Sequence, residues 1–310
     1  MSNNVYLVDS SIYVFRAWFT VPDSVVNQDN EPVNAVYGFA DFVYQFLSQA
    51  KPEYVAFTFD ESLQTSFRNE IYPEYKANRD PAPEELKRQF KYCREFIEAL
   101  GICEVGSPHY EADDLIGTLA KRMRNKGHPI TILSADKDLA QLITEEDIFW
   151  NFAKGERNSI PQIKKQFGVY PHQIADQLAI AGDTVDNIPG VPGIGMATAA
   201  KLLNKFASLD ELLKNIHKVS EMKIRGAKRI QGLIADHEDD VLLYRKLTEI
   251  ECEAKLPDTV KLKRKKPDFT MLSDLFEVLN FGDFRREKWM SDEENTVTKY
   301  KRTRCILMPF

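Results

Sequence analysis

The segment GICEVGSPHYEADDLIGTLAKRMRNKGHPITILSAD, residues 101–136, decides the fold class of this chain. It opens with a short apolar run and continues as an amphipathic helical pattern over 112–127, which closes at a glycine. It ends with the β-rich run PITILSAD, which stops at Asp136. Apolar strands that alternate with helices in this way predict a parallel sheet in an α/β domain.

The sequence before this segment repeats the same pattern. The run NVYLVD ends at Asp9, the run EYVAFTFD ends at Asp60, and helical spacing of apolar residues covers 36–50 and 84–101. The carboxyl ends of parallel strands lie along one edge of the sheet, where ligands bind. We therefore expect Asp9, Asp60 and Asp136 to lie close together.

Three more acidic residues occupy a single turn at the start of the helix over 112–127. Acids in a first helical turn favour the helix dipole by roughly 0.3 to 1 kcal/mol each, so a purely structural explanation is available. Glu111 and Asp114 are one turn apart and can share the face toward the sheet edge. Asp113 points elsewhere on ideal geometry, so spacing alone leaves its role open.

These carboxylates, with Asp138 beside them, predict a metal site. So many acids cannot all ionise close together without large pKa penalties, so positive charge must lie among them. Oxygen ligands without cysteine or histidine favour Mg²⁺ or Mn²⁺. The number of carboxylates exceeds the needs of one ion, which makes a two-metal site the simplest interpretation.

A glycine- and proline-rich turn lies between two helical stretches in 161–206. It begins with GDTVDN, whose Asp183 and Asp186 are either ordinary turn residues or further site residues. Gly190, Gly193 and Gly195 then directly precede a helix, where free backbone N–H groups can meet a phosphate. The turn is either a tight helix–helix connection or a helix-hairpin-helix that holds a nucleic-acid backbone without reading bases.

Bulk composition is that of an ordinary globular protein: 310 residues, 43% hydrophobic and 28% charged, with a net charge of −6. The length suggests one large domain with a smaller one attached. No segment resembles a membrane span or a signal peptide, so we expect a cytoplasmic protein without membrane contact. Its four cysteines form no C-x-x-C pair, which argues against a structural zinc site. Basic residues cluster within 68–94 and 261–266, either as solvated faces or as partner-binding surfaces.

Taken together, the motifs resemble the bacterial and phage 5′-nuclease family, which includes the 5′ to 3′ exonuclease domain of DNA polymerase I and the flap endonucleases. The resemblance covers about the first 250 residues and includes YLVDS, FTFDE, SFRNEIYPEYKANRD, YEADDLIGTLA, ILSADKDLAQLI and GDTVDNIPGVPGIGMATAAKLL. It implies a mainly parallel central sheet flanked by helices, the PIN-like 5′-nuclease fold, with a helical arch and a helix-hairpin-helix (helix-three-turn-helix) subdomain.

The resemblance also implies a role for particular residues. It assigns nine acids to two Mg²⁺ or Mn²⁺ ions, some directly and some through water: Asp9, Asp60, Glu111, Asp113, Asp114, Asp136, Asp138, Asp183 and Asp186. It gives Lys76 and Arg79 a catalytic role at the scissile phosphate. It assigns DNA contacts to Arg68, Tyr75, Gly190, Gly193, Gly195 and Lys201. Whether the hairpin also binds K⁺ stays open.

On this basis we expect three regions. They are an α/β nuclease core over 1–165 with an arch over about 63–95, a helix-hairpin-helix subdomain over 166–255, and a C-terminal extension with a basic tail over 256–310. The expected activity is 5′ to 3′ exonuclease and 5′-flap endonuclease action on DNA ends, flaps and forks by a free-standing, monomeric enzyme, with RNA–DNA primer junctions as further candidate substrates. The alternatives are a junction-binding protein that does not cut and a PIN-type ribonuclease.

Overall fold

The computed structural model describes residues 3–61, 65–257 and 259–290. The chain divides into two compact units. The first comprises Met1–Tyr13, Gln45–Ala82 and Cys103–Arg264, and the second comprises Val14–Tyr44, Pro83–Ile102 and Lys265–Phe310. The predicted basic tail and the start of the predicted arch at residue 63 lie outside the described residues.

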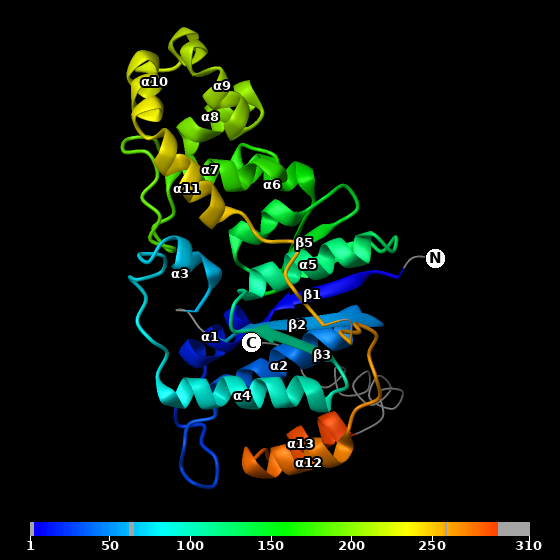
Figure 1. The fold of residues 1–310 in the computed structure, drawn as a ribbon. Helices are drawn as coiled ribbons and strands as arrows, with labels where there is room; N and C mark the ends of the chain where they lie inside the picture. Colours follow the sequence, from blue (N-terminus) through cyan, green and yellow to red (C-terminus); the bar gives the residue numbers. More distant parts are fainter. Residues whose placement is uncertain (1–2, 62–64, 258, 291–310) are drawn as a thin grey trace, which may run out of the picture. The chain divides into compact units, whose positions relative to one another are not determined.

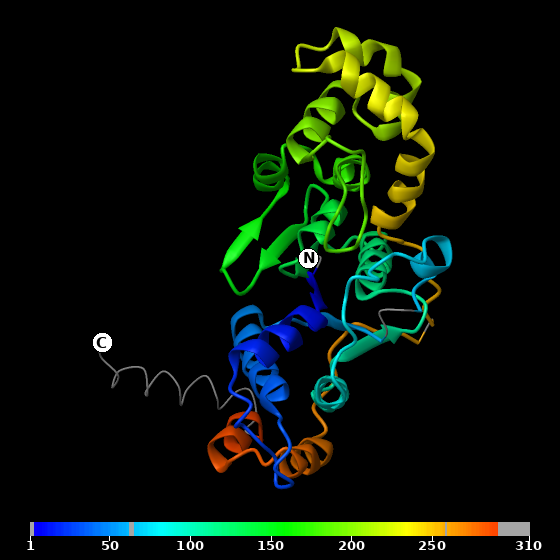
Figure 2. The same cartoon turned by 90° about the vertical axis from the view of Figure 1, so that its left-hand side faces the viewer.

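A six-stranded sheet in the order β3-β2-β1-β4-β5-β6 forms the centre of the first unit (Figure 1). All neighbouring strands are parallel except β6, which pairs antiparallel with β5 at one edge of the sheet (Figure 2). The predicted α/β class with a mainly parallel sheet is therefore confirmed. The strands are β1 (Val5–Asp9), β2 (Tyr54–Asp60), β3 (Cys103–Ser107), β4 (Ile130–Leu133), β5 (Ile148–Asn151) and β6 (Glu156–Asn158).

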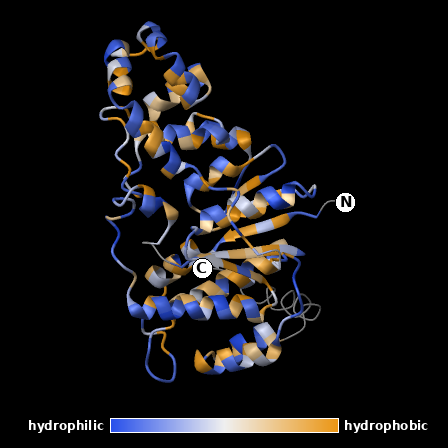
Figure 3. Ribbon diagram, in the orientation of Figure 1, coloured by the Kyte–Doolittle hydropathy of each residue, from blue (hydrophilic) through white to orange (hydrophobic). Residues whose placement is uncertain are grey.

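The strands are largely buried, as their continuous apolar runs predict. All four residues of β4 are buried, as are five of the seven in β2. Figure 3 shows apolar residues along the strands and alternating apolar and polar stretches on the helices. Helix α5 (Ala112–Arg124) packs on β1 and β2, and most of its residues are buried. It is the crossover helix that the segment 101–136 predicts.

The rest of the first unit is helical and follows the sheet in sequence. Helix α7 (Ile174–Ala181) and helix α8 (Met196–Phe206) pack together and are joined by the glycine-rich turn, as the predicted hairpin requires. None of the helices in the described part of the chain is long and apolar enough to span a membrane. The other elements of this unit are α3 (Phe67–Ile71), η1 (Lys137–Leu142), α6 (Ile160–Phe167), η2 (Pro171–Gln173), α9 (Leu209–Lys214), η3 (Ile216–Glu221), α10 (Ala227–Asp236) and α11 (Glu238–Thr248).

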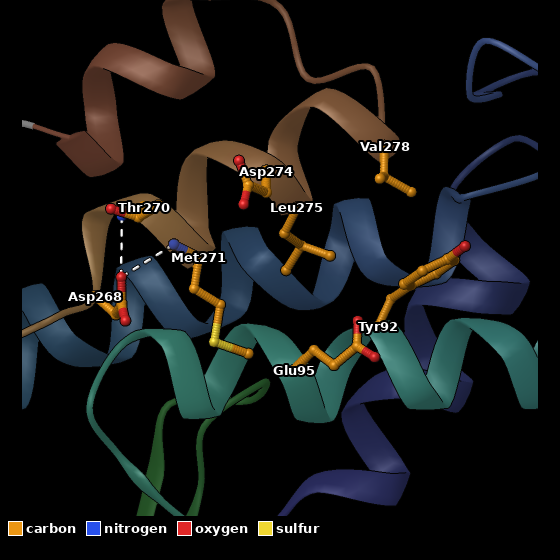
Figure 4. Close-up of a pocket in the computed structure, with 8 residues that line it drawn as sticks. All are labelled: Tyr92, Glu95, Asp268, Thr270, Met271, Asp274, Leu275 and Val278. Atoms are coloured by element: carbon orange, nitrogen blue, oxygen red, sulfur yellow. Dashed lines mark hydrogen bonds between the residues drawn. The ribbon is translucent and has the colours of Figure 1, made fainter.

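The second unit consists of helices. It holds most of α1 (Ser10–Thr20) and of α2 (Asn34–Ala50), together with α4 (Glu84–Ala99), α12 (Phe269–Val278) and α13 (Asp283–Met290). A cavity of about 410 Å³ lies between α4 and α12, and its lining includes Glu95 and Leu275 (Figure 4). This cavity contains none of the predicted site residues, which belong to the first unit apart from part of the predicted arch.

Candidate metal centre

Two of the predicted acids end neighbouring strands of the sheet. Asp9 is the last residue of β1, and its Oδ2 accepts a hydrogen bond of 2.7 Å from the Ser134 hydroxyl. Burial, followed by the charge of Asp60, raises the pKa of Asp9 to about 7, although Ser134 acts in the opposite direction. Asp60, the last residue of β2, accepts a hydrogen bond of 2.9 Å from the backbone N–H of Ala112. The start of α5 is thereby held against the strand ends.

Glu111 is the N-cap of α5, and Lys76 and Tyr75 engage its side chain. Its Oε2 lies 2.8 Å from the Lys76 ammonium and accepts a hydrogen bond of 3.1 Å from the Tyr75 hydroxyl. Burial opposes its ionisation, but Lys76 and Arg68 outweigh burial and lower its pKa. Its second oxygen, Oε1, is buried without a hydrogen-bond partner among the described residues. One carboxylate oxygen therefore stays available to a further ligand.

The two aspartates that follow Glu111 in the helical pattern, Asp113 and Asp114, differ in burial and in their partners. Asp113 is half-buried, and its pKa is raised by burial and then by Asp136 and Asp9, so it belongs with the strand-end acids. Asp114 is fully buried and turns back to accept a hydrogen bond of 3.1 Å from the Glu111 backbone N–H. In this capping box the N3 side chain bonds to the N-cap backbone, so Asp114 stabilises the first turn of α5.

The Arg68 side chain is buried beside Asp114. This location corrects the expectation that Arg68 contacts a DNA phosphate. Its guanidinium forms a bidentate pair with Asp114, with N–O distances of 2.7 and 2.8 Å. It also donates to the backbone carbonyls of Leu247 and Glu249, each at 2.8 Å. The side chain is 2% exposed, so no donor faces solvent. Asp114 accepts a further bond from the Glu251 N–H at 2.9 Å, and both of its oxygens are occupied.

The acids after β4 form a second part of the cluster. The strand ends at Leu133, three residues before the predicted end, because the Asp136 side chain caps η1 by accepting a hydrogen bond of 2.9 Å from the Asp138 N–H. Burial, then Asp136 and Asp183, raise the pKa of Asp138 to about 8. Its Oδ1 is buried without a hydrogen-bond partner among the residues described.

The turn GDTVDN brings the last two acids to the same group. Asp183 is buried, and its Oδ2 lies 3.7 Å from the Lys137 ammonium. Asp186 is paired with Arg79 at 2.6 Å and accepts a hydrogen bond of 3.1 Å from the Tyr75 hydroxyl. Burial raises the pKa of Asp186, while Lys76 and Arg79 act in the opposite direction. Both aspartates act electrostatically on Asp138, and their role as site residues stays a prediction.

The loop 75–79 holds the predicted catalytic cations against this turn. The backbone of Lys76 has a positive φ of 55°, which is strained for a residue with a side chain, and its N–H donates to the Asp186 carbonyl at 3.1 Å. Asn78 donates to the Thr184 carbonyl at 2.9 Å, and Asn187 donates to the Glu74 carbonyl at 2.7 Å. Sequence reasoning missed these two asparagines, although both stand inside the motifs YKANR and GDTVDN.

Tyr75 differs from its predicted place at the substrate. It is 2% exposed, and its hydroxyl lies between Glu111 and Asp186, 3.1 Å from each. Burial is the main reason that its pKa is raised, which keeps the hydroxyl protonated as a hydrogen-bond donor. Tyr75 therefore supports the carboxylates from within the protein.

The three glycines of the hairpin differ in their structural role. A Cβ on Gly190 would lie 2.2 Å from the Gly182 backbone nitrogen, and its φ is 65°, so packing alone requires glycine there. Gly195 is the N-cap of α8 and faces open space. Gly193 has a φ of 81° and lies beside the Arg229 guanidinium. Lys201 lies exposed on α8. The contacts of these residues with DNA stay predictions.

The donor set fits hard divalent cations. It consists of carboxylates alone, several with raised pKa values, and it leaves Glu111 Oε1 and Asp138 Oδ1 buried and unpaired within the described residues. As they stand, no three acidic, histidine or cysteine side chains of residues 3–61, 65–257 and 259–290 surround one point closely enough to ligate an ion. Carboxylates repel one another, so bound cations would have to draw them together or reach some of them through water.

A mainly parallel sheet with carboxylates at its strand ends, joined to a helical hairpin, is the arrangement expected of a metal-dependent nuclease. Two family models match consecutive parts of the chain. The 5′-3′ exonuclease N-terminal resolvase-like domain matches residues 4–168, and the 5′-3′ exonuclease C-terminal SAM fold matches residues 169–270. The chain belongs to the 5′-3′ exonuclease family.

Sequence similarity to individual proteins supports this family membership. The 5′-3′ exonuclease of Aquifex aeolicus is 36% identical over 284 residues, which cover 88% of this chain and 94% of that protein. DNA polymerase I of Bacillus subtilis is 36% identical over 258 residues, which cover 82% of this chain but 28% of the polymerase.

Two solved structures share the fold. The phage T5 5′-exonuclease with bound zinc has a TM-score of 0.66 at 20% identity, and the match covers 89% of this chain and 99% of that one. The catalytic core of Rad2 in complex with a DNA substrate has a TM-score of 0.61 at 17% identity, covering 93% and 91%.

Proposed function

We propose that this protein is a structure-specific 5′ nuclease that hydrolyses DNA phosphodiester bonds at 5′ ends and flaps with two divalent cations, Mg²⁺ or Mn²⁺. Family membership supports nuclease chemistry, and relatives have been solved with divalent metal ions and with DNA. The observation that carries the two-metal proposal is the acidic cluster itself, in which burial and neighbouring carboxylates raise the pKa of Asp9 to about 7 and that of Asp138 to about 8.

The proposal divides the acids between two groups of ligands. The charges of Asp60 and Asp136 act on Asp9 and Asp113, and the charges of Asp136, Asp183 and Asp186 act on Asp138, so Asp136 is shared by the two groups. When bound, two divalent cations would lower the pKa of a water to supply hydroxide at neutral pH and would stabilise the departing 3′ oxygen. Glu111 would contribute its unpaired oxygen as a metal ligand. Asp114 would not bind metal but would stabilise the first turn of α5.

The chain's own cations would stabilise the charge that develops on the phosphate. Lys76 lies 10% exposed beside Glu111, and although burial opposes its charge, Glu111 and Asp186 raise its pKa, so it is cationic at neutral pH. Arg79 is more exposed and is held on Asp186. Cations preorganised in a water-poor site stabilise developing negative charge without reorganisation. Products with 5′-phosphate and 3′-hydroxyl ends are expected.

A labelled 5′-flap oligonucleotide tests the proposal. We expect cleavage with Mg²⁺ and none with EDTA, and cleavage of DNA in preference to a matched RNA, which would separate this activity from that of a PIN-type ribonuclease. Binding of the flap without cleavage in Mg²⁺ would instead identify a junction-binding protein and overturn the proposal.

The variant Asp136→Asn tests the site in the same assay. It removes one negative charge from the cluster but leaves the hairpin intact, so turnover should fall by orders of magnitude while DNA affinity is kept. Near-normal cleavage by this variant in Mg²⁺ would remove Asp136 from the set of metal ligands.

A further inference from the structure

The cavity between α4 and α12 has no role in the proposed chemistry, and all of its lining residues belong to the second unit. Helix α12 lines it with side chains at positions i, i+3, i+4 and i+7, which share one face of a helix: Met271, Asp274, Leu275 and Val278. Tyr92 and Glu95, one turn apart on α4, line it from the other side. We call this cavity the α4–α12 groove.

Part of the apolar surface of α12 is not used in packing. Leu272 and Phe276 are fully buried, and the Phe276 ring contacts that of Phe96 on α4 with the ring centroids 6.2 Å apart. These contacts hold α12 on α4. Met271, by contrast, is half-buried in the groove, and Val278 is 49% exposed. Figure 4 shows Met271 directed from α12 toward α4. A ligand that covered these side chains would remove apolar surface from water.

The groove is also negatively charged. Its eight lining residues include three acids and no base: Glu95, Asp268 and Asp274. Asp274 is exposed and forms no ion pair with any of the described residues, while Glu95 pairs with the exposed Lys91 at 3.8 Å. A complementary ligand therefore combines positive charge with apolar side chains, because a charged ligand alone would leave Met271 and Val278 in water.

One segment of the chain itself has this composition. Residues 299–310, KYKRTRCILMPF, lie outside the described residues and contain no acid. The first half of the segment carries four cations: Lys299, Lys301, Arg302 and Arg304. The second half, CILMPF, is apolar throughout. The segment thus matches the groove in both charge and hydrophobicity.

The described part of the chain ends close to α4. Trp289, in the last turn of α13, packs edge-on against Phe96, the residue after Glu95, with the ring centroids 5.0 Å apart. Eight residues separate Met290 from Lys299, and an extended chain of that length spans about 26 to 29 Å. Helix α12 has 10 residues and is therefore about 15 Å long. The connection is long enough to reach the groove, and tethering gives the segment a high effective concentration there.

We propose that the α4–α12 groove binds residues 299–310 of the same chain. The basic half pairs with the three acids of the groove, and the apolar half covers Met271 and Val278. The family models end at residue 270, before the groove face of α12. The inference is independent of the proposed function, because the groove contains none of the acids of the metal centre.

Disulfide cross-linking in the full-length chain tests the inference, because Cys305 lies within the segment. Val278→Cys places a thiol in the groove. Glu277→Cys is the matched control, since Glu277 is the preceding residue and is exposed but does not line the cavity. After mild oxidation, mass spectrometry of the digested protein measures the fraction of chains with a disulfide to Cys305. We expect this fraction to be several-fold higher for Val278→Cys than for Glu277→Cys.

A charge exchange tests the complementarity in the Val278→Cys background. Asp274→Lys should lower the cross-linked fraction several-fold, because it places a cation against the basic half of the segment. Adding Arg302→Glu and Arg304→Glu should restore much of the cross-linking, which mere damage to the groove would not allow. Raising the salt from about 50 to about 500 mM should also lower the fraction when Asp274 is present, because salt screens exposed charges.

Three results would overturn the inference. Equal cross-linking of Val278→Cys and Glu277→Cys would leave the groove to a basic partner protein. A disulfide that joins two chains, seen as a dimer in non-reducing electrophoresis, would identify the segment of a second copy as the occupant. A fraction that Asp274→Lys leaves unchanged would exclude the charge pairing. Thermal unfolding checks that the variants fold, and Thr270→Cys, at another exposed groove position, repeats the comparison.

Discussion

Lys76 combines a strained backbone conformation with a buried charge. Both features are typical of residues that take part in catalysis. Its φ of 55° is held by the bond to the Asp186 carbonyl, and its ammonium lies 2.8 Å from Glu111. We expect Lys76→Ala to lower the single-turnover cleavage rate by about 100-fold or more, the scale on which preorganised donors act. The fold should be kept at a lower stability, because Glu111 loses one buried partner but keeps Arg68 at 3.7 Å, and Lys126→Ala, a change of an exposed side chain, should cleave at the parental rate. Equal rates for Lys76→Ala and the parent would exclude Lys76 from the mechanism.

For Arg68 we expect a loss of stability instead of a loss of catalysis, because its contacts in the structure stabilise the fold. Removing one member of a buried ion pair leaves an uncompensated charge, which typically costs about 3 to 5 kcal/mol. Arg68→Ala should therefore lower the free energy of unfolding by that order, measured by urea denaturation. Lys121→Ala, which breaks an exposed pair with Glu253, should change little. A stable Arg68→Ala variant with weakened DNA binding would restore the phosphate role that the motif suggested.

At the scale of elements, the first turn of α5 shows where sequence spacing stops being sufficient. The helix and its acidic start follow from the sequence, and so does the gathering of acids at the strand ends. Which acid faces the cluster does not follow, because the capping box and the distant Arg68 decide it together. A partner 46 residues away cannot be inferred from the periodicity of a single helix.

Two glycines of the hairpin turn should differ in how well they tolerate substitution by alanine. Gly190→Ala would place a Cβ 2.2 Å from backbone at a positive φ, so the turn has to shift. Gly195→Ala meets nothing within 4 Å and has an ordinary φ of −94°. We expect a clear loss of thermal stability for Gly190→Ala, of several degrees, and little loss for Gly195→Ala. Equal melting temperatures of the two variants would contradict the close packing described for Gly190.

At the scale of the whole molecule, the sequence predicts the sheet, the crossover helix and the hairpin because each depends on local pattern and turn chemistry. The parts that it misses depend on side chains that meet across the fold. Asn78 and Asn187 join the loop 75–79 to the turn at 183–187, and Ser134 supports Asp9 from another strand end. The three predicted region boundaries, 1–165, 166–255 and 256–310, stay predictions.

The whole acidic cluster also links stability to pH and metal. Asp9 and Asp138 have folded pKa values of about 7 and about 8, above the ordinary value of 3.8, so the folded protein binds more protons than the unfolded chain across that interval. Their contribution is present in full below about pH 4 and is lost as the pH rises through the folded values. In EDTA, the melting temperature should therefore fall between about pH 5 and 8.5.

Divalent cations bind the ionised carboxylates, so Mg²⁺ should raise the melting temperature more at about pH 8 than at about pH 5. The double variant Asp9→Asn and Asp138→Asn should flatten both the pH dependence and the Mg²⁺ effect, because it removes the groups that exchange a proton for a metal. The salt bridge of Glu111 with Lys76 acts in the opposite direction, since the pKa of Glu111 is lowered, but its effect is confined to acidic pH. A melting temperature in EDTA that is level across this range, and an equal response to Mg²⁺ at both ends, would show that the carboxylates do not form one electrostatic unit.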